Sequence, residues 1–578
     1  MSFHGKRPNF LIITTDEQRF PPPYENPDAA AWRTANLKGQ ERIASRGMSF
    51  QRHYTGSTAC APSRTTIYTG QYPSLHGVSQ TPGIGKSSFD QNMFWLKPDT
   101  VPTLGAWFRA AGYQTHWRGK WHLSYADIDV PGTQTALLSN DNNGESYPDR
   151  VELYREANRL EPYGFKGWIG PEPHGKSQAN DGTNRDPGFA DQSIRLLKEL
   201  DQAYRANPDG QEPFLAVCSF VNPHDIVFSG HLLQNWFSGF QAALEAGSLP
   251  KVTPPPTANE SLQTKPRCQQ DYIYLYPRMY LPQATDETYR QFYYYLMGEV
   301  DKHIDSVYSC LESCSFFEDT IVVFTSDHGE MLGAHGGAHQ KWYSAYDEIL
   351  RVPFTISNPQ LYATPKTCDT LTSHLDLLPT LLGLAGADTE ALLRKLRISH
   401  SEAHPLVGRD LSSWIVDGNA PPDGVLYFMT DDNVENGSQM WNPITQQPYN
   451  SVVQPNHLET VIANIATPDG SSLWKYTRYF DNPRFYDTTV KKAPIVGAGN
   501  PDGVVTAEGI PPEFEAYNLS EDPLEEHNLM SPHCEKRISP EILGQLETLL
   551  NEQRKQKRLH PQTTNQDAGE ETVAPWRD

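Results

Sequence analysis

Short, almost wholly apolar segments that end in acidic residues most constrain the fold of this chain. Residues 9–15 read NFLIITT and stop at Asp16, while residues 320–326 read TIVVFTS and stop at Asp327. Runs of this kind are typical of strands that are buried on both faces, as in a parallel sheet between helices. Comparable runs predict further strands at 113–117, 214–220 and 352–357.

Helical patterns separate these predicted strands. Residues 103–112 have helical periodicity that ends at Gly112, and a long helical stretch covers 285–311. The alternation of strands and helices predicts an α/β fold, with a large mixed but mainly parallel sheet sandwiched by helices. Functional side chains are then expected beyond the carboxyl ends of the strands, where Asp16 and Asp327 fall.

The later part of the chain has a different pattern of apolar runs and turns. The composition turns to loop at 417–424, and the runs LYFMT, TVIANIA and SLWKYTRYF then alternate with turn signals, including Pro-Asp-Gly at 468–470. We therefore predict a catalytic domain over 1–420 and a smaller α+β domain with an antiparallel sheet over 421–558. The polar composition of 559–578 predicts a disordered tail. Turn-rich segments predict surface insertions at 139–146, 170–187 and 250–266.

The composition limits the partners of the protein. The chain has 578 residues, of which 37% are hydrophobic and 11% aromatic, enough to bury a large core. Asp and Glu outnumber Lys and Arg by 70 to 48, and the net charge of -22 argues against nucleic acid and against an anionic membrane. An anionic substrate would therefore need a local cationic pocket.

Cysteine usage and hydropathy bear on the location of the protein. The seven cysteines are scattered, with no spacing typical of a zinc site or a disulfide framework, which favours a reducing compartment. The first residues lack the apolar core of a secretory signal, and no run of about 18 apolar residues occurs. We expect a soluble, cytoplasmic protein.

The segment Cys60-Ala-Pro-Ser-Arg64 is the most informative motif for chemistry. Pro62 suits the first turn of a helix, and Arg64 lies four residues after Cys60 and so on the same helical face. Because the dipole at a helix N-terminus favours an anion, a thiol at Cys60 is expected to be acidified and an oxyanion to be held. The alternative is a structural cysteine in a helix cap, which is commoner for a lone cysteine.

Two strand ends predict a cation site. Asp16 and Glu17 follow the first strand, and Asp327 and His328 follow a later one. Carboxylate oxygens suit calcium, magnesium or manganese, and a histidine nitrogen among them favours manganese. The alternative is that Asp327 only stabilises a turn by hydrogen bonding.

Taken in order, these motifs resemble those of the type I, formylglycine-dependent sulfatases of the alkaline phosphatase superfamily. The resemblance spans roughly residues 8–530 and implies an alkaline-phosphatase-like fold. It rests on Asp16, Cys60 to Arg64, Gly119 to His122, Asn222 to His224, Ser326 to Gly329, Lys341, Arg351 to Pro353, Ser373 to Thr380 and Tyr517 to Pro523. The ordered set is specific, whereas any single member is weak.

The resemblance implies a modified nucleophile and a metal. Cys60 would be oxidised to formylglycine by a formylglycine-generating enzyme, and a hydroxyl of the hydrated aldehyde would attack the substrate. One divalent cation would be bound, calcium in the first place, with Mn²⁺ and Mg²⁺ as the other possibilities. Its ligands would be Asp16, Glu17, Asp327, His328 and the modified Cys60.

The remaining motif residues are given catalytic roles by the same resemblance. Arg64 and Lys120 would steady the formylglycine hydrate, and His122 would take a proton from its second hydroxyl. His224 and Lys341 would contact the sulfate oxygens and assist the leaving group. Without this context, buried structural histidines and solvated surface lysines would be the commoner interpretation.

Two positions depart from the arylsulfatase pattern. Glu17 stands where a second aspartate is typical, and His328 stands where many arylsulfatases have asparagine, as in choline-sulfatase-like and phosphonate-monoester-hydrolase-like relatives. Lys120 and His122 match the arylsulfatase arrangement. We expect an arylsulfatase-like hydrolase that cleaves an aryl or alkyl sulfate monoester into sulfate and a phenol or alcohol.

Two other functions remain open on the same residues. One is hydrolysis of phosphonate monoesters or phosphate diesters on this scaffold. The other, of a different class, is an inactive binding protein in which Cys60 stays a thiol. Self-association into a homodimer or higher homo-oligomer, for example through the tail, is compatible with the sequence. Structural roles are assigned to His53, His76, His116, His174, His335 and Tyr293 to Tyr295.

Overall fold

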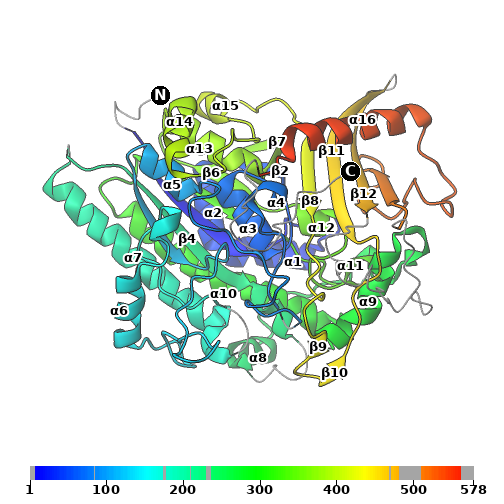
Figure 1. The fold of residues 1–578 in the computed structure, drawn as a ribbon, viewed down its shortest axis with the longest axis horizontal. Helices are drawn as coiled ribbons and strands as arrows, with labels where there is room; N and C mark the ends of the chain where they lie inside the picture. The colour runs from blue at the N-terminus through cyan, green and yellow to red at the C-terminus, as the bar shows by residue number, and fades with distance from the viewer. Residues whose placement is uncertain are drawn as a thin grey trace.

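The computed structural model describes residues 7–561 apart from 84, 174–176, 209, 230–235, 281, 468–469 and 481–509. His174, most of the predicted tail and two residues of the turn at 468–470 lie outside the described residues. Within the described part, the chain forms a seven-stranded sheet, a four-stranded sheet and a two-stranded hairpin (Figure 1).

The seven-stranded sheet contains the predicted buried strands. In spatial order its strands are β3 (Gln114–Gly119), β4 (Phe214–Pro223), β1 (Asn9–Asp16), β5 (Thr320–Ser326), β6 (Phe354–Ser357), β2 (Gly47–Tyr54) and β7 (Lys366–Ser373). β6 runs antiparallel to both of its neighbours, and the other strands are parallel to one another. The predicted mixed, mainly parallel sheet is confirmed.

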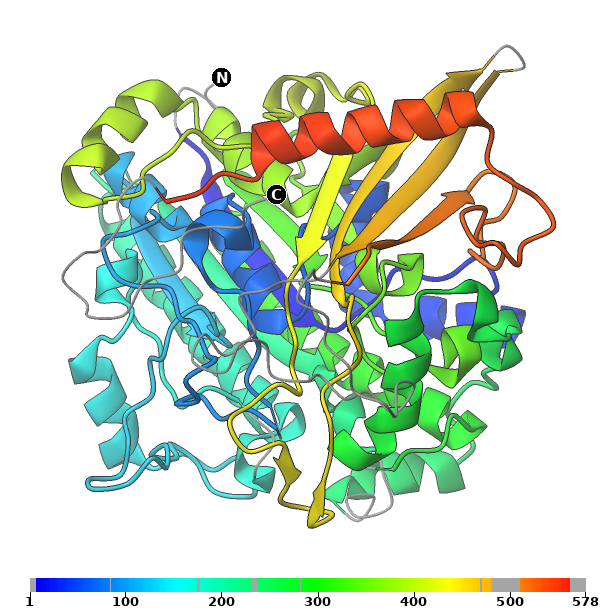
Figure 2. The ribbon, with the colours of Figure 1, turned by 45° about the vertical axis from the view of Figure 1, so that its right-hand side comes forward.

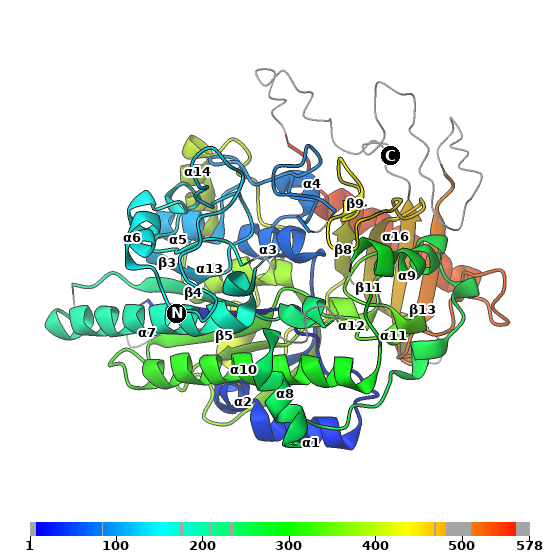
Figure 3. The same ribbon diagram turned by 90° about the horizontal axis from the view of Figure 1, so that it is seen from below.

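The two faces of this sheet are covered by different helices, because successive side chains of a strand point to opposite faces. Phe10 and Ile12 of β1 face one core, and Leu11 and Ile13 face the other. The first core is shared with α3 (Cys60–Thr69), α5 (Leu104–Ala110), α13 (Leu377–Leu384) and α14 (Thr389–Ser399). The second is shared with α2 (Lys38–Ser45), α7 (Gly182–Ala206) and α10 (Glu287–Glu312), and Figure 3 shows these helices on opposite sides of the strands.

One predicted surface insertion, at 170–187, ends inside a helix. α7 begins at Gly182, and the Asp181 side chain caps it by accepting a hydrogen bond from the amide of Asn184 at 2.8 Å. Asp, Gly and Asn serve both in turns and at helix N-termini, so their composition does not separate the two structures. The same segment is not confined to the surface, because Glu172 is only 4% exposed.

A second, antiparallel sheet lies in the C-terminal part, as predicted. Its spatial order is β13 (Glu513–Asn518), β12 (Gly470–Phe480), β11 (His457–Thr467) and β8 (Leu426–Thr430). α16 (Pro540–Lys557) covers one face, where Leu546 and Leu550 pack on the strands (Figure 2). The other face packs on α9 (Arg267–Met279) and on the segment 331–350, which joins it to the large sheet. The predicted boundary at 420 stays a prediction.

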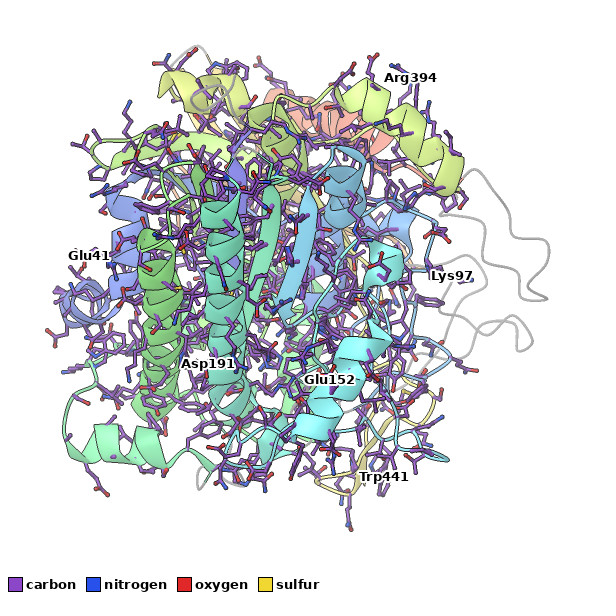
Figure 4. All side chains as sticks on the ribbon, turned by 90° about the vertical axis from the view of Figure 1, so that its left-hand side faces the viewer. Glu41, Lys97, Glu152, Asp191, Arg394 and Trp441 are labelled. Carbon is purple, nitrogen blue, oxygen red and sulfur yellow. The ribbon has the colours of Figure 1, made fainter. Side chains whose placement is uncertain are left out.

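The shorter elements lie around these layers. They are α1 (Pro27–Asn36), α4 (Pro73–His76), α6 (Pro148–Ala157), α8 (Ser238–Glu245), α11 (Ala334–Gly337), α12 (Asp347–Leu350), α15 (Ser412–Asp417), and the hairpin strands β9 (Trp441–Asn442) and β10 (Gln447–Pro448). Figure 4 shows Glu152 of α6 and Asp191 of α7 pointing away from the sheet. None of the helices in the described ranges has both the length and the apolar character needed to cross a membrane.

Candidate active site

The candidate site residues gather at the carboxyl edge of the large sheet. β1 pairs with β4 so that Asp16 lies beside Pro223, and with β5 so that Thr15 lies beside Ser326. Lys120 follows β3, and its amide donates a hydrogen bond to the Ser219 carbonyl of β4 at 2.9 Å. Four strands therefore deliver the predicted side chains to one place, as expected for parallel strands.

Cys60 is the first residue of α3, and its side chain points at the acidic strand ends. Its Sγ lies 3.6 Å from Oδ1 of Asp16 and 3.2 Å from Nε2 of His328. One ligand atom from each of Asp16, Cys60, Asp327 and His328 falls within 4.8 Å of the others, and all four residues are buried. The tertiary structure thus assembles four of the five predicted metal ligands into one cluster.

His328 is oriented toward this cluster by its own backbone. Its Nδ1 lies 3.0 Å from the Gly329 carbonyl, which can only accept, so Nδ1 carries the proton and Nε2 presents its lone pair to Cys60. A carbonyl partner of this kind fixes the tautomer of metal-binding histidines. Two carboxylates and this nitrogen are a donor set that fits a hard divalent cation once an oxygen replaces the sulfur of Cys60.

Each of the two aspartates of the cluster forms an ion pair with a buried cationic side chain. Oδ2 of Asp16 lies 2.7 Å from Nζ of Lys120, and Oδ2 of Asp327 lies 3.3 Å from a guanidinium nitrogen of Arg64. Burial would raise the pKa of Asp16, but Lys120 and the nearby histidines hold it well below its usual range. For Asp327, burial and the adjacent Asp16 carboxylate raise the pKa to about 7. This crowding of two carboxylates is what a bound cation would relieve.

Glu17 and Lys341 form a neighbouring ion pair, with 2.8 Å between Oε2 and Nζ. Both side chains are almost fully buried, so Lys341 is not a solvated surface lysine. Glu17 falls into a second possible ligand set, with Asp16 and the half-buried His224, whose ligand atoms also lie within 4.8 Å of one another. Glu17 is therefore near the cluster but is not a member of the four-residue set.

Arg64 is held by backbone carbonyls of the motif 119–122, and His122 is held by a residue outside the motifs. Arg64 Nε donates to the Trp121 carbonyl at 3.1 Å, and another of its nitrogens donates to the Lys120 carbonyl at 2.6 Å. The amide of His122 donates to Oε1 of Glu172 at 3.0 Å, and His122 has a φ of 67°. A histidine in this left-handed region is costly, and the Glu172 carboxylate helps to hold it there.

The loop that carries Lys341 is organised by Glu330. Oε1 of Glu330 accepts hydrogen bonds from the amides of Leu332 at 3.0 Å and Gln340 at 2.8 Å, and from the Tyr289 hydroxyl at 3.0 Å. Leu332 and Gln340 both have positive φ, 49° and 65°. A buried carboxylate thus fixes a strained backbone next to Lys341.

One expectation for Cys60 was wrong. The thiol is not acidified, because burial and the adjacent Asp16 carboxylate raise the pKa of Cys60 above its ordinary value. These effects exceed those of Lys341 and Lys120, which act in the opposite direction. An unmodified Cys60 is therefore a neutral thiol in this pocket.

Glu172 and Glu330 are the supporting residues that sequence reasoning missed. Glu172 lies in a segment whose composition predicted a surface loop, and Glu330 directly follows the Ser-Asp-His-Gly motif. Of these two residues, only Glu330 could have been found from the sequence, because it directly follows that motif. The histidines interpreted as structural behave accordingly: His53, His76, His116 and His335 are buried and do not belong to either ligand set.

The chain belongs to the sulfatase family, the hydrolases of sulfate esters, because the family model named Sulfatase matches residues 8–387. It is 29% identical to the uncharacterized sulfatase YidJ of Escherichia coli over 397 residues, which are 67% of this chain and 70% of that protein. It is also 29% identical to the delta 4,5-hexuronate-2-O-sulfatase of Bacteroides thetaiotaomicron, over 66% of this chain and 69% of that protein.

Solved structures share the fold over nearly the whole chain. A 2-O GAG sulfatase aligns with a TM-score of 0.57 at 21% identity, covering 96% of this chain and 93% of that one. The phosphonate monoester hydrolase of Agrobacterium radiobacter aligns with a TM-score of 0.54 at 18% identity, covering 96% of both chains. The alkaline-phosphatase-like fold with its C-terminal antiparallel sheet is thereby confirmed.

Proposed function

We propose that this protein hydrolyses aryl or alkyl sulfate monoesters with a formylglycine derived from Cys60 as nucleophile and one divalent cation as cofactor. The observation that carries the proposal is the position of Cys60, whose Sγ lies 3.6 Å from Asp16 and 3.2 Å from His328 at the start of α3. A neutral thiol is a poor nucleophile there, whereas an oxygen in its place matches the carboxylates as a ligand for a hard cation.

The cation would be held by Asp16, Asp327 and His328, with Glu17 as a further candidate ligand. When bound, it would neutralise the sulfate oxygens and favour the ionised form of a neighbouring hydroxyl. Calcium is the first choice because carboxylate oxygens dominate the donor set, and manganese and magnesium are the other possibilities.

The side chains around the cluster supply the remaining chemistry. A hydroxyl oxygen of the hydrated aldehyde attacks sulfur, and the bond from sulfur to the alcohol oxygen breaks. His224 or Lys341 protonates the departing oxygen, which would otherwise leave as an anion. Lys120 and Arg64, both fully buried beside Asp16, hold the hydrate in place.

His122 completes the cycle in this proposal. It takes the proton of the second hydroxyl, the carbon–oxygen bond to sulfate breaks, and sulfate leaves as the aldehyde forms again. Water then rehydrates the aldehyde. The backbone of His122 is strained, and the hydrogen bond from its amide to Glu172 helps to hold it in place.

The decisive experiment is the mass of the tryptic peptide 53–64, which contains Cys60, from protein produced together with a formylglycine-generating enzyme. An aldehyde-bearing peptide that reacts with a hydrazide probe, together with turnover of sulfate esters, is the expected result. Cys60→Ala protein is the control. Fully active protein with only unmodified Cys60 would refute the mechanism, and an inactive thiol form would support the binding-protein alternative.

A second function deserves the same assay. The pair Asp327-His328 and the shared fold of a phosphonate monoester hydrolase favour testing phosphonate monoesters and phosphate diesters beside the sulfate esters. We propose sulfate esters as the preferred class because the family model and the relatives reported above are sulfatases. A higher kcat/KM for a phosphonate monoester would reverse the assignment.

We also propose a cytoplasmic location. All seven cysteines are unpaired, including Cys310 and Cys314 one helical turn apart, as expected in a reducing compartment. Fractionation of producing cells, with detection of the protein by antibody, tests this proposal.

A further inference from the structure

Asp432 connects the nucleophile segment with the loop that carries Lys341. It lies in the polypeptide that leaves β8 of the four-stranded sheet, beyond the residues matched by the family model. Its Oδ2 accepts hydrogen bonds from the amide of Ala59 at 3.2 Å and from the indole nitrogen of Trp342 at 3.0 Å. Ala59 directly precedes Cys60, and Trp342 directly follows Lys341.

The surroundings of Asp432 make these bonds strong. Its side chain is only 3% exposed, and its Oδ1 accepts from the amide of Thr81 at 3.1 Å. Burial raises the pKa of Asp432, and the buried Lys86 opposes part of this effect. Hydrogen bonds to a charged acceptor in such a site are roughly twice as strong as neutral ones.

β8, the strand before Asp432, is hydrogen-bonded to the segment that precedes Cys60. The Met429 amide donates to the Gly56 carbonyl at 3.2 Å, and the Thr430 hydroxyl donates to the Thr58 carbonyl. Figures 1 and 2 show β8 beside α3. The C-terminal sheet therefore packs directly against the polypeptide that delivers Cys60 to the site.

On the other side of this contact, Trp342 lies next to the ammonium group of Lys341. Nζ of Lys341 lies 5.2 Å from the centroid of the Trp342 ring, so a rotation of this indole moves the surface against which the ammonium group rests. Trp342 is 7% exposed and its indole nitrogen donates to Asp432. Loss of that acceptor would leave a buried donor unsatisfied and free the ring to move.

We propose that Asp432 is a positioning residue that sets the distance between the nucleophile at Cys60 and the cation of Lys341. The proposal rests on the proposed function, because Cys60 and Lys341 act on the substrate there. In this role, the polypeptide that leaves the C-terminal sheet supports a catalytic site at the edge of the large sheet. A misplacement of reacting groups by about 1 Å can cost on the order of 100-fold in rate.

The test compares Asp432→Asn, Trp342→Phe and the double variant with the wild type. Asparagine has one acceptor oxygen and cannot serve all three donors, and phenylalanine keeps a ring but removes the indole N–H. We expect each single variant to lower kcat by about 10- to 100-fold with KM changed less than about threefold. Both changes remove the same hydrogen bond, which joins Trp342 to Asp432. The loss of kcat in the double variant should therefore be much smaller than the product of the two single losses.

Asp431→Asn is the matched control. Asp431 is equally buried but accepts from Nδ1 of His457 within the C-terminal sheet, at 3.2 Å. This variant should lower Tm and leave kcat within about twofold of the wild type. If Asp432→Asn fails to fold, Trp342→Phe alone tests the proposal. Asp432→Glu keeps the charge and should retain part of the wild-type kcat.

Either of two kinetic results would overturn the proposal: kcat of folded Asp432→Asn within twofold of wild type, or losses that multiply in the double variant. A crystal structure of Asp432→Asn gives a readout that needs no substrate, since we expect the Trp342 ring and the Lys341 side chain to shift relative to Cys60. Unchanged positions would also overturn it. Failure of the proposed function is distinguishable, because the wild type itself would then cleave none of the sulfate esters.

Discussion

Nζ of Lys341 lies 2.8 Å from Oε2 of Glu17, although the two residues are 324 positions apart in the chain. The pair joins the end of β1 to the loop after β5 and puts a permanent cation next to the acidic cluster. Burial would lower the pKa of Lys341, but the acidic groups around it, including the Glu17 and Asp16 carboxylates, hold it above its ordinary value. Lys341 therefore stays charged throughout the physiological range.

Lys341→Ala tests the role of this cation. Removing one preorganised donor from the charge that develops in the transition state typically costs about 10²- to 10³-fold in rate, whereas trimming a surface lysine costs almost nothing. We expect the loss to grow along a series of sulfate esters with increasing leaving-group pKa, because poor leaving groups accumulate the most charge. The measurement is kcat/KM for both proteins across the series, and an unchanged rate on every member would contradict the role.

Asp327→Asn tests the metal site. The change keeps the size of the side chain but removes a charged ligand, so we expect bound metal and activity to fall together, the activity by at least about 10²-fold. Elemental analysis of the purified protein gives the metal content, and chelation of the wild type should have the same effect. Asp301→Asn is a suitable control, since this buried carboxylate accepts from the amide of Gly39 in α2 at 2.7 Å. Full turnover by metal-free protein would rule the site out.

Glu17→Gln decides whether Glu17 is a ligand. Its ligand atom groups with those of Asp16 and His224, outside the four-residue cluster. We expect metal affinity, measured by competition with a chelator, to fall by about 10-fold, less than for Asp327→Asn. Unchanged affinity with a lowered kcat would mean that Glu17 serves only as the partner of Lys341.

His335 gives the protein a pH-dependent stability. Its Nδ1 lies 2.7 Å from Glu260 and its Nε2 lies 3.7 Å from Glu348, while its ring stacks on Tyr346 at 3.5 Å. Burial alone would lower the pKa of His335, but the hydrogen bond to Glu260 and the nearby Glu348 carboxylate raise it from 6.5 to about 9. The pKa is higher in the folded state, so the stabilisation, of the order of 3 kcal/mol, is complete below pH 6.5 and is lost as the pH rises through about 9.

The measurement is the difference in Tm between wild type and His335→Gln from pH 6 to pH 10. We expect this difference to shrink as the pH passes through about 9, because the wild type then loses the imidazolium. His116→Gln is the matched control, since burial lowers the pKa of His116 to about 3 and this residue is neutral over the whole interval. A constant Tm difference for His335→Gln would show that His335 is not charged in the folded protein.

The sequence by itself determined the strands and the chemistry they carry. The runs at 9–15, 214–220 and 320–326 each contain at least four consecutive apolar residues, which is typical of a strand buried on both faces, and each is followed by a site residue. The spacing from Cys60 to Arg64 likewise specified one helical face. The strands β2 and β7 were not predicted, because their segments GMSFQRHY and KTCDTLTS mix polar and apolar side chains at or near the edge of the sheet.

Only the tertiary structure decided how these residues meet and what supports them. Partner choice depends on distances between segments that are remote in sequence, as for Glu330 with Gln340 or Asp432 with Ala59, and no local pattern encodes such distances. The same holds for Cys60, whose helix N-terminus predicts an acidified thiol. In the structure, burial and the adjacent Asp16 carboxylate instead raise the pKa of Cys60, because desolvation disfavours the thiolate.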